Sequence, residues 1–189
     1  MRLMITRHGE TEENKAGVLQ GHLPGVLSDL GKEQAGKLAE RLSNEKIDLI
    51  ISSDLARARD TAKIIAEFHP DADFVSNKKL REMNIGNSHG MPIGDVDWDN
   101  PPKDFETREE MGERVFELFD ETLKNNLGKN VLFVGHGGIN GALIKKIHEE
   151  ELDESSYWKN QNNTCVSIFD IEESGKVKTV LLNCTEHLK

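Results

Sequence analysis

Two histidines occupy equivalent points of the sequence, each one residue beyond a short apolar segment and directly before a glycine. His8 follows residues 3–6, and His136 follows residues 131–134. Short apolar runs of this kind predict buried strands, and an open parallel sheet binds its ligands at the carboxyl ends of its strands. The glycine after each histidine lets the backbone turn sharply and approach a ligand closely. We therefore expect both imidazoles at the edge of the sheet where sites form.

Two arginines accompany these histidines. Arg7 adjoins His8, and Arg57 falls in the first turn of the helix that is predicted after the second strand. A guanidinium group carries a permanent positive charge and a planar set of donors that match phosphate oxygens. The combination predicts a site for a small anion. A metal site built from the two histidines and carboxylates is the alternative, but the arginines would repel a cation, and the two cysteines have no metal-ligand spacing.

The elements that must position these residues alternate between short apolar runs and amphipathic stretches. The pattern predicts strands over residues 3–6, 47–51, 74–75, 131–134, 165–169 and 177–182, the last two joined by a hairpin turn at 172–176. It predicts helices over 29–42 with Ser28 as cap, from Ser53 or Asp54 to before Pro70, over 107–126 and over 138–150. Residues 83–104 contain several glycines and prolines and are predicted to be mostly loop.

This alternation predicts an α/β protein. We expect residues 1–189 to form a single-domain three-layer α/β/α sandwich with a mostly parallel central sheet. No linker, repeat or low-complexity segment interrupts the pattern.

Composition excludes several classes of protein. The net charge of −10 argues against a general nucleic-acid binder, which needs a basic surface. No apolar run is long enough to span a membrane, and charge breaks the N-terminal apolar stretch before a signal peptide could form. Two cysteines without a pairing pattern indicate free thiols in a reducing compartment, so we expect a cytoplasmic protein. The sequence leaves the oligomeric state open, with a homodimer as one alternative.

The segments around these residues resemble the histidine phosphatase superfamily, which includes cofactor-dependent phosphoglycerate mutases and acid phosphatases. Arg7-His8-Gly9-Glu10-Thr11 matches its signature, and four further segments follow in the family's order, at residues 20–35, 52–62, 80–86 and 134–138. The similarity spans nearly the whole chain.

The resemblance implies a role for each site residue. His8 would attack phosphorus and carry the phosphoryl group, with its second ring nitrogen donating to a backbone carbonyl. Glu82 would act as general acid and then as general base. The phosphoryl oxygens would be held by Arg7, Arg57, His136 and Asn14, and the substrate would also contact Gln20, Gly21 and Gly137. The chemistry implied needs neither a metal ion nor a cofactor.

The resemblance leaves the reaction and the substrate open. A mutase must exclude water, and the similar mutases carry a longer insertion after the acid than residues 87–105 provide, so we expect a phosphomonoesterase that acts on a small phosphorylated metabolite. A cofactor-dependent phosphoglycerate mutase is the first alternative. A non-catalytic phosphate-binding domain is the second, although the chain retains both nucleophile and acid. A dinucleotide-binding module is disfavoured, because Asn140 replaces the third glycine of the motif at 135–140.

Specificity is expected to depend on the loop over residues 88–103, which contains His89 and Trp98. Three aspartates of this loop would disfavour highly anionic leaving groups, namely Asp95, Asp97 and Asp99. The chain departs from the family's pattern at His22, Pro24, Asn140 and residues 105–107, which border the substrate rather than the phosphoryl group.

Overall fold

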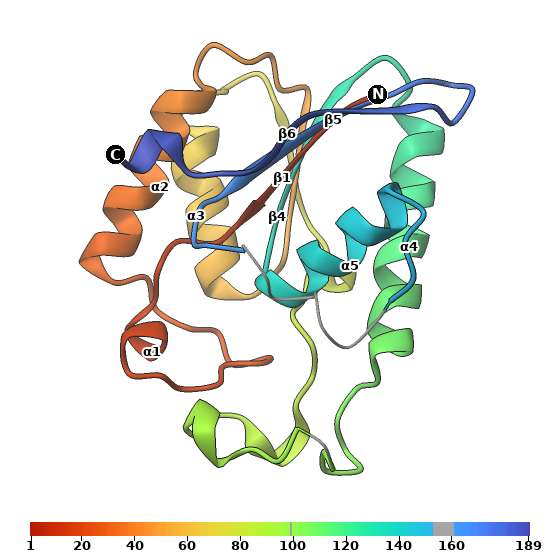
Figure 1. The fold of residues 1–189 in the computed structure, drawn as a ribbon. Helices are drawn as coiled ribbons and strands as arrows, with labels where there is room; N and C mark the ends of the chain where they lie inside the picture. The colour runs from red at the N-terminus through yellow and green to blue at the C-terminus, as the bar shows by residue number, and fades with distance from the viewer. Residues whose placement is uncertain (99, 153–160) are drawn as a thin grey trace.

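A six-stranded sheet runs through the centre of the molecule (Figure 1), in a computed structural model that describes residues 1–98, 100–152 and 161–189. Its strand order is β3-β2-β4-β1-β5-β6. The first four of these pair in parallel, and β5 and β6 add an antiparallel edge. The strands are β1 (Arg2–Arg7), β2 (Leu49–Ser52), β3 (Asp73–Ser76), β4 (Asn130–Gly135), β5 (Val166–Ile171) and β6 (Val177–Cys184).

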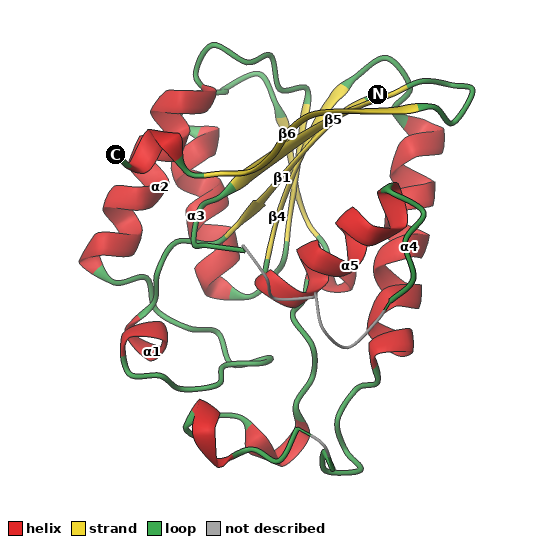
Figure 2. Cartoon of the chain, in the orientation of Figure 1, coloured by secondary structure: helices red, strands yellow, loops and turns green. Residues whose placement is uncertain are grey.

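Helices cover both faces of this sheet (Figure 2). α2 (Asp29–Leu42) and α3 (Ala56–Ala66) pack on one face, and α4 (Arg108–Asn125) and α5 (Gly137–Ile147) pack on the other. A single turn, α1 (Glu12–Lys15), lies between β1 and α2. The predicted three-layer α/β/α sandwich with a mostly parallel central sheet is confirmed.

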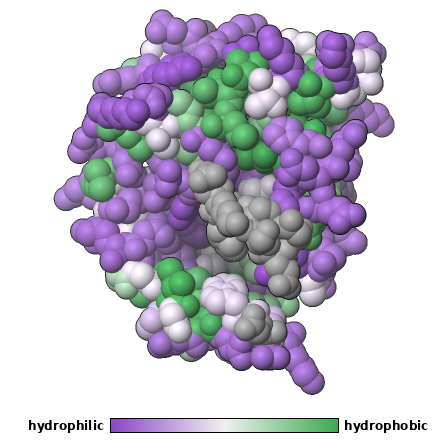
Figure 3. All heavy atoms as spheres, viewed as in Figure 1, coloured by the Kyte–Doolittle hydropathy of each residue, from purple (hydrophilic) through white to green (hydrophobic). Residues whose placement is uncertain are grey.

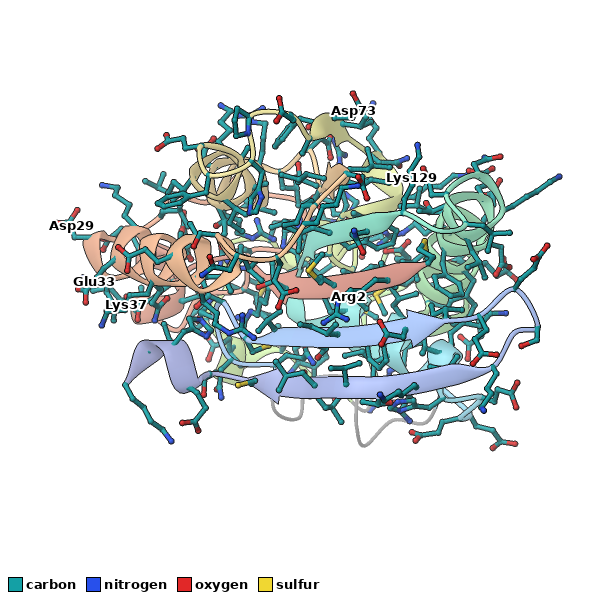
Figure 4. All side chains as sticks on the ribbon, turned by 90° about the horizontal axis from the view of Figure 1, so that it is seen from above. Arg2, Asp29, Glu33, Lys37, Asp73 and Lys129 are labelled. Atoms are coloured by element: carbon teal, nitrogen blue, oxygen red, sulfur yellow. The ribbon has the colours of Figure 1, made fainter. Side chains whose placement is uncertain are left out.

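The central strands are apolar on both sides because each face is covered. Leu3 and Ile5 of β1 join the core under α4 and α5, whereas Met4 between them joins the core under α2 and α3. Continuous apolar runs of this kind are typical of buried parallel strands. The outer sides of the helices are charged instead, as Asp29, Glu33 and Lys37 on α2 show (Figure 4).

Helix ends agree with the predicted caps in part. Ser28 caps α2, and its hydroxyl oxygen accepts a hydrogen bond from the amide of Gly31 at 3.0 Å. The prediction that Ser53 or Asp54 caps α3 is wrong. That helix begins after Leu55 without a side-chain cap. The Ser53 hydroxyl instead accepts a hydrogen bond from the amide of Leu55, before the helix begins.

The segment between β3 and α4 is irregular, as predicted from its glycines and prolines. It contains three short 3₁₀ helices, η1 (Lys78–Leu80), η2 (Gly86–Ser88) and η3 (Ile93–Asp95). A fourth, η4 (Glu186–Leu188), follows β6 near the C-terminus. The part of this segment that contains η2 and η3, drawn in yellow-green, lies below the sheet in Figure 1, beyond the carboxyl ends of the parallel strands.

Two further observations bear on the composition. Among the described residues, no helix is both long and apolar enough to cross a membrane. Both cysteines are free thiols, and Cys165 is buried whereas Cys184 is partly exposed.

Candidate active site

His8 follows directly after β1 and is almost completely buried. Its Nδ1 lies 2.7 Å from the carbonyl oxygen of Gly9, so this nitrogen carries the proton and donates. Nε2 therefore keeps its lone pair and accepts a hydrogen bond from Nε of Arg57 at 3.3 Å. Burial, with the positive charges of Arg57 and Arg7, holds the pKa of His8 well below its ordinary value. An unprotonated Nε2 can act as a nucleophile without prior deprotonation.

A close approach between two backbone segments fixes the turn after His8. A Cβ atom on Gly31 would lie 1.9 Å from the Glu10 carbonyl oxygen, and one on Gly9 would lie 2.4 Å from the Gly31 carbonyl oxygen. Only glycine at both positions lets the start of α2 lie this close to the turn. Thr61 of α3 adds a second contact, since its hydroxyl accepts from the Gly9 amide at 3.0 Å and donates to the Arg57 carbonyl.

Arg57 is buried in the first turn of α3, as the sequence predicts. Its Nη2 donates to the Gly21 carbonyl at 2.9 Å, and Nη1 donates to the carbonyl of Leu23. Burial lowers the pKa of Arg57 to about 10, so the guanidinium keeps its positive charge at neutral pH. The loop over residues 20–25 thus holds a cation beside the His8 ring.

Arg7 approaches the same site from the last residue of β1. One of its terminal nitrogens donates to the carbonyl of Gln161, in the segment that leads into β5. Burial lowers the pKa of Arg7, and the carboxylate of Glu82 acts in the opposite direction. Two cations therefore lie near His8.

His136 is fully buried just before α5, and its ring centroid lies 5.2 Å from that of His8. Neither of its ring nitrogens has a hydrogen-bond partner among the described residues. Burial and the neighbouring positive charges of Arg57 and Arg7 hold its pKa well below the ordinary value. A buried imidazole without a protein partner has donor and acceptor capacity for a ligand oxygen.

Glu82 brings a carboxylate to the site from the segment after η1. Its Oε2 accepts from the Gly138 amide at 3.0 Å, and Oε1 accepts from the amide of Met83 at 2.9 Å. Gly138 lies in the first turn of α5, where free amides and the helix dipole favour a negative charge. The carboxylate thereby joins the segment before η2 to the element that carries His136.

The backbone of Glu82 is held by two side chains that the sequence analysis did not single out for this role. His22 Nε2 lies 2.8 Å from the Glu82 carbonyl oxygen, and Arg114 Nη2 donates to the same oxygen at 3.0 Å. Arg114 also donates to the carbonyls of Lys79 and Arg81 and pairs with Glu106. Arg114 projects from the middle of α4, and no local motif would indicate that it reaches this segment.

These residues surround a cavity of about 510 Å³. We call the polar part of its wall the catalytic end, which comprises Arg7, His8, Asn14, Gln20, Gly21, Arg57 and Glu82. The apolar end comprises Val18, Leu19, Met83, Ile85, Ile93 and Trp98, and Arg108 completes the described wall. Two predicted site residues lie outside this wall: His136 contacts the His8 ring, and Gly137 is the first residue of α5.

Asn14 is oriented by its own turn. Its Oδ1 accepts from the Thr11 amide at 3.2 Å, so its amino group is the donor that this side chain can offer to a ligand. Asn163, which the sequence analysis missed, donates from Nδ2 to the His8 carbonyl at 2.9 Å and to Asn14 Oδ1 at 3.5 Å. It tethers the segment before β5 to the turn that carries His8.

Two of the loop aspartates do not line the cavity. Asp95 and Asp97 are exposed and do not belong to the described wall, and Asp99 lies outside the described residues. The effect of these aspartates on highly anionic leaving groups stays a prediction. Within the described parts of the chain, no three side chains of the metal-binding types are grouped around a common point.

Comparison with known proteins places this site in context. The chain is 28% identical to phosphoglycerate mutase-like protein 4 of Arabidopsis thaliana, over 99% of this chain and 86% of the relative. It is 32% identical to a probable phosphoglycerate mutase, GpmB, of Yersinia pestis, over 78% of this chain and 74% of the relative.

Solved structures share the fold along its whole length. YhfR of Bacillus stearothermophilus superposes with a TM-score of 0.89 at 24% identity, over 100% of this chain and 99% of the other. A phosphoserine phosphatase mutant of Entamoeba histolytica in complex with phosphoserine gives a TM-score of 0.85 at 27% identity, over 100% and 99% of the two chains. A mycobacterial glucosyl-3-phosphoglycerate phosphatase gives 0.84 at 26%, over 97% and 99%.

The model of the histidine phosphatase superfamily (branch 1) matches residues 3–185, which include every residue of the catalytic end. The chain therefore belongs to the histidine phosphatase superfamily, as its sequence motifs predict.

Proposed function

We propose that this protein is a phosphomonoesterase that hydrolyses a small phosphorylated metabolite through a phosphohistidine on His8. The observation that carries the proposal is the state of the His8 ring. Its Nδ1 is committed to the Gly9 carbonyl, and its Nε2 lone pair faces the guanidinium of Arg57 at the wall of the cavity. A nucleophile beside a fixed cation is the arrangement that phosphoryl transfer requires.

In the first proposed step, His8 Nε2 attacks phosphorus in line with the ester oxygen. The N–P bond forms as the bond between phosphorus and the leaving oxygen breaks. Glu82, in its protonated form, gives its proton to that oxygen, so the product alcohol leaves neutral. The phosphoryl group and the Nδ1 proton remain on the imidazole, and the Gly9 carbonyl accepts a hydrogen bond from that proton throughout.

In the second proposed step, water attacks the phosphohistidine. Glu82 now accepts a proton from the water, the O–P bond forms, and the P–N bond breaks to release phosphate. The histidine is again neutral and the glutamic acid again protonated, so one water is consumed for each ester hydrolysed. Arg7, Arg57, Asn14 and His136 stabilise the charge on the transferred oxygens, where positioning and electrostatics supply most of the catalysis.

A phosphoglycerate mutase is the second candidate, because one relative is named a probable phosphoglycerate mutase and another a phosphoglycerate mutase-like protein. A mutase must hold a second phosphate or carboxylate while water is excluded. Beyond the catalytic end, the described cavity wall contributes six apolar residues and one cation, Arg108. This composition favours hydrolysis of an ester with a single phosphate.

The test is a screen of purified protein against a panel of phosphomonoesters, with phosphate release as the readout. His8→Asn should abolish release of phosphate, and His148→Asn, a partly exposed histidine paired with Thr179 away from the cavity, should leave it unchanged. Isomerisation of 3-phosphoglycerate without phosphate release would favour the mutase. Binding of phosphate by a protein that turns over none of the panel would favour a non-catalytic domain.

We further propose a cytoplasmic setting, in keeping with the two unpaired cysteines.

A further inference from the structure

The cavity is larger than its catalytic end requires. Its volume of about 510 Å³ lies within the range of roughly 300–1,000 Å³ that is typical of sites for whole small molecules. A phosphoryl group held between His8 and Arg57 occupies the polar end alone. The remainder of the volume is available to the leaving group, so the wall around that remainder determines which esters bind.

That wall is apolar and comes from three separate segments. Val18 and Leu19 precede the loop that holds Arg57, Met83 and Ile85 follow Glu82, and Ile93 and Trp98 belong to the segment below the sheet. Backbone hydrogen bonds tie the first and third segments together, from the Leu19 amide to the Met91 carbonyl and from the Ile93 amide to the Gly17 carbonyl, both at 2.9 Å. These hydrogen bonds hold two of the three segments of the apolar end in a fixed relative position.

Two of these side chains are exposed although they are large and apolar. Ile93 is 49% exposed and Trp98 is 41% exposed, and the Trp98 ring packs edge-on against Phe105 with centroids 6.2 Å apart. In Figure 3, a small group of apolar atoms lies among polar atoms at the lower end of the molecule, where Figure 1 draws the yellow-green segment, and a larger apolar area lies nearer the upper end. An exposed apolar patch at the mouth of a cavity is a typical ligand-binding surface.

Charge at this end is sparse within the described residues. Arg108, at the start of α4, is the charged member of the wall beyond the catalytic end, and Asp95 and Asp97 are exposed residues that do not belong to that wall. A leaving group with its own phosphate or several hydroxyls would lose hydration against six apolar side chains, which is costly. An apolar leaving group gains about 25 cal/mol for each Å² that it buries.

We propose that the preferred substrates are monophosphate esters of apolar alcohols or phenols, with the leaving group packed on the apolar end and Trp98 as its chief specificity-determining contact. This inference rests on the proposed phosphatase function. It distinguishes the substrate from the sugar-acid and amino-acid phosphates that give two of the structural neighbours their names.

The test compares 2-naphthyl phosphate with phenyl phosphate, whose leaving groups have similar acidity but differ by one fused ring. We expect kcat/KM to be about tenfold or more higher for the naphthyl ester. We also expect kcat/KM to be higher for hexyl phosphate than for 3-phosphoglycerate or phosphoserine. Trp98→Ala should lower the naphthyl-to-phenyl ratio toward one. The matched control is Leu182→Ala, an apolar residue of β6 that is 47% exposed and should leave both the ratio and the rates unchanged.

A binding measurement separates this inference from the proposed function. Calorimetry with naphthylmethylphosphonate and benzylphosphonate reports the same ring preference without turnover. Hydrolysis with no preference for the larger ring, or a preference that survives in Trp98→Ala, would overturn the inference and leave the phosphatase intact. A Trp98-dependent preference in binding, without turnover of any ester, would support the apolar end and overturn the phosphatase. Neither binding preference nor turnover would overturn both.

Discussion

At the scale of single residues, the two histidines of the site differ more than their matching sequence contexts suggest. Both follow a central strand and precede a glycine. His8 has one nitrogen bound to a carbonyl and the other facing a guanidinium, whereas both His136 nitrogens lack a partner among the described residues. The first arrangement suits a nucleophile, and the second suits a group that binds a phosphoryl oxygen.

The general-acid role proposed for Glu82 leads to a prediction about leaving groups. Glu82→Gln should lower kcat/KM for alkyl phosphates by about 10²- to 10⁴-fold, because the departing alkoxide then receives no proton. For p-nitrophenyl phosphate, whose leaving group needs no proton, formation of the phosphoenzyme should fall less than about tenfold. Rapid-mixing kinetics on both esters measures this difference, with Glu113→Gln on the exposed side of α4 as the control. Equal losses on both esters would show that Glu82 is not the acid.

His22 leads to a related prediction about positioning. His22 contacts the Glu82 carbonyl oxygen, which Arg114 also contacts. Loss of the His22 side chain should therefore make the position of Glu82 less well defined, while Arg114 still holds its backbone. We expect His22→Ala to lower kcat/KM for alkyl phosphates by about tenfold and to spare formation of the phosphoenzyme from p-nitrophenyl phosphate. His22→Gln, which retains an N–H donor, should restore much of the loss. A loss that is equal for both esters, without rescue, would indicate a structural role only.

At the scale of elements, the strands and the helices α2 and α4 were predicted closely, whereas the ends of α3 and α5 were predicted less well. β1 and β4 lie within one or two residues of their predicted limits, because continuous apolar runs identify buried strands. α5 ends three residues before its predicted limit of residue 150. Glu149 has a positive φ of 58° there, and because it is not a glycine the sequence does not indicate this helix end. α1 was not predicted, since a single turn leaves no helical period in the sequence.

The site residues also divide into those that the sequence predicts and those that it does not. His8, Arg57 and Glu82 meet at one edge of the sheet, as strand order and the family motifs predict. Arg114 and Asn163 were missed because their partners lie more than 30 residues away in sequence, so their roles depend on tertiary packing. The predicted specificity loop contributes Ile93 and Trp98 to the apolar end, whereas the other four apolar residues were missed because they come from separate segments.

Two glycines of α2 give a prediction about how the elements hold His8. A Cβ on Gly31 would meet the Glu10 carbonyl at 1.9 Å, whereas one on Gly36 would have no neighbour within 4 Å. Gly31→Ala should therefore destabilise the fold by about 1–3 kcal/mol and lower activity by displacing the turn after His8. Gly36→Ala should stabilise it by up to about 1 kcal/mol through helix propensity. Denaturant unfolding of both variants measures the effects, and equal effects would contradict the close approach.

At the scale of the whole molecule, an acidic protein holds a cationic site. The net charge of −10 opposes the approach of an anion over long distances, whereas Arg7 and Arg57 attract it once it reaches the cavity. The field of the molecule and the field of the site thus have opposite signs. Charge on the substrate beyond its single phosphate would add to the long-range repulsion.

The buried histidines make the stability of the whole molecule depend on pH. Their pKa values are depressed in the folded state, so the unfolded chain binds more protons once the pH falls below the ordinary value of 6.5. The free energy of unfolding should fall as the pH decreases from 6.5, by about 1.4 kcal/mol per pH unit for each histidine that stays neutral when folded. A double variant with His8→Asn and His136→Asn should show a shallower slope between pH 6.5 and 5.5, and an unchanged slope would contradict the buried neutral pair.

The central claim is that His8 carries the phosphoryl group, and isolation of the intermediate tests it most directly. Glu82→Gln is mixed with p-nitrophenyl phosphate and quenched in base, because phosphohistidine is labile in acid, and its tryptic peptides are analysed by mass spectrometry. The account predicts one phosphoryl group, on the peptide of residues 8–15, and none when His8→Asn is added to the same variant. A phosphoryl group on any other peptide, or p-nitrophenol release that continues in the His8→Asn protein, would contradict it.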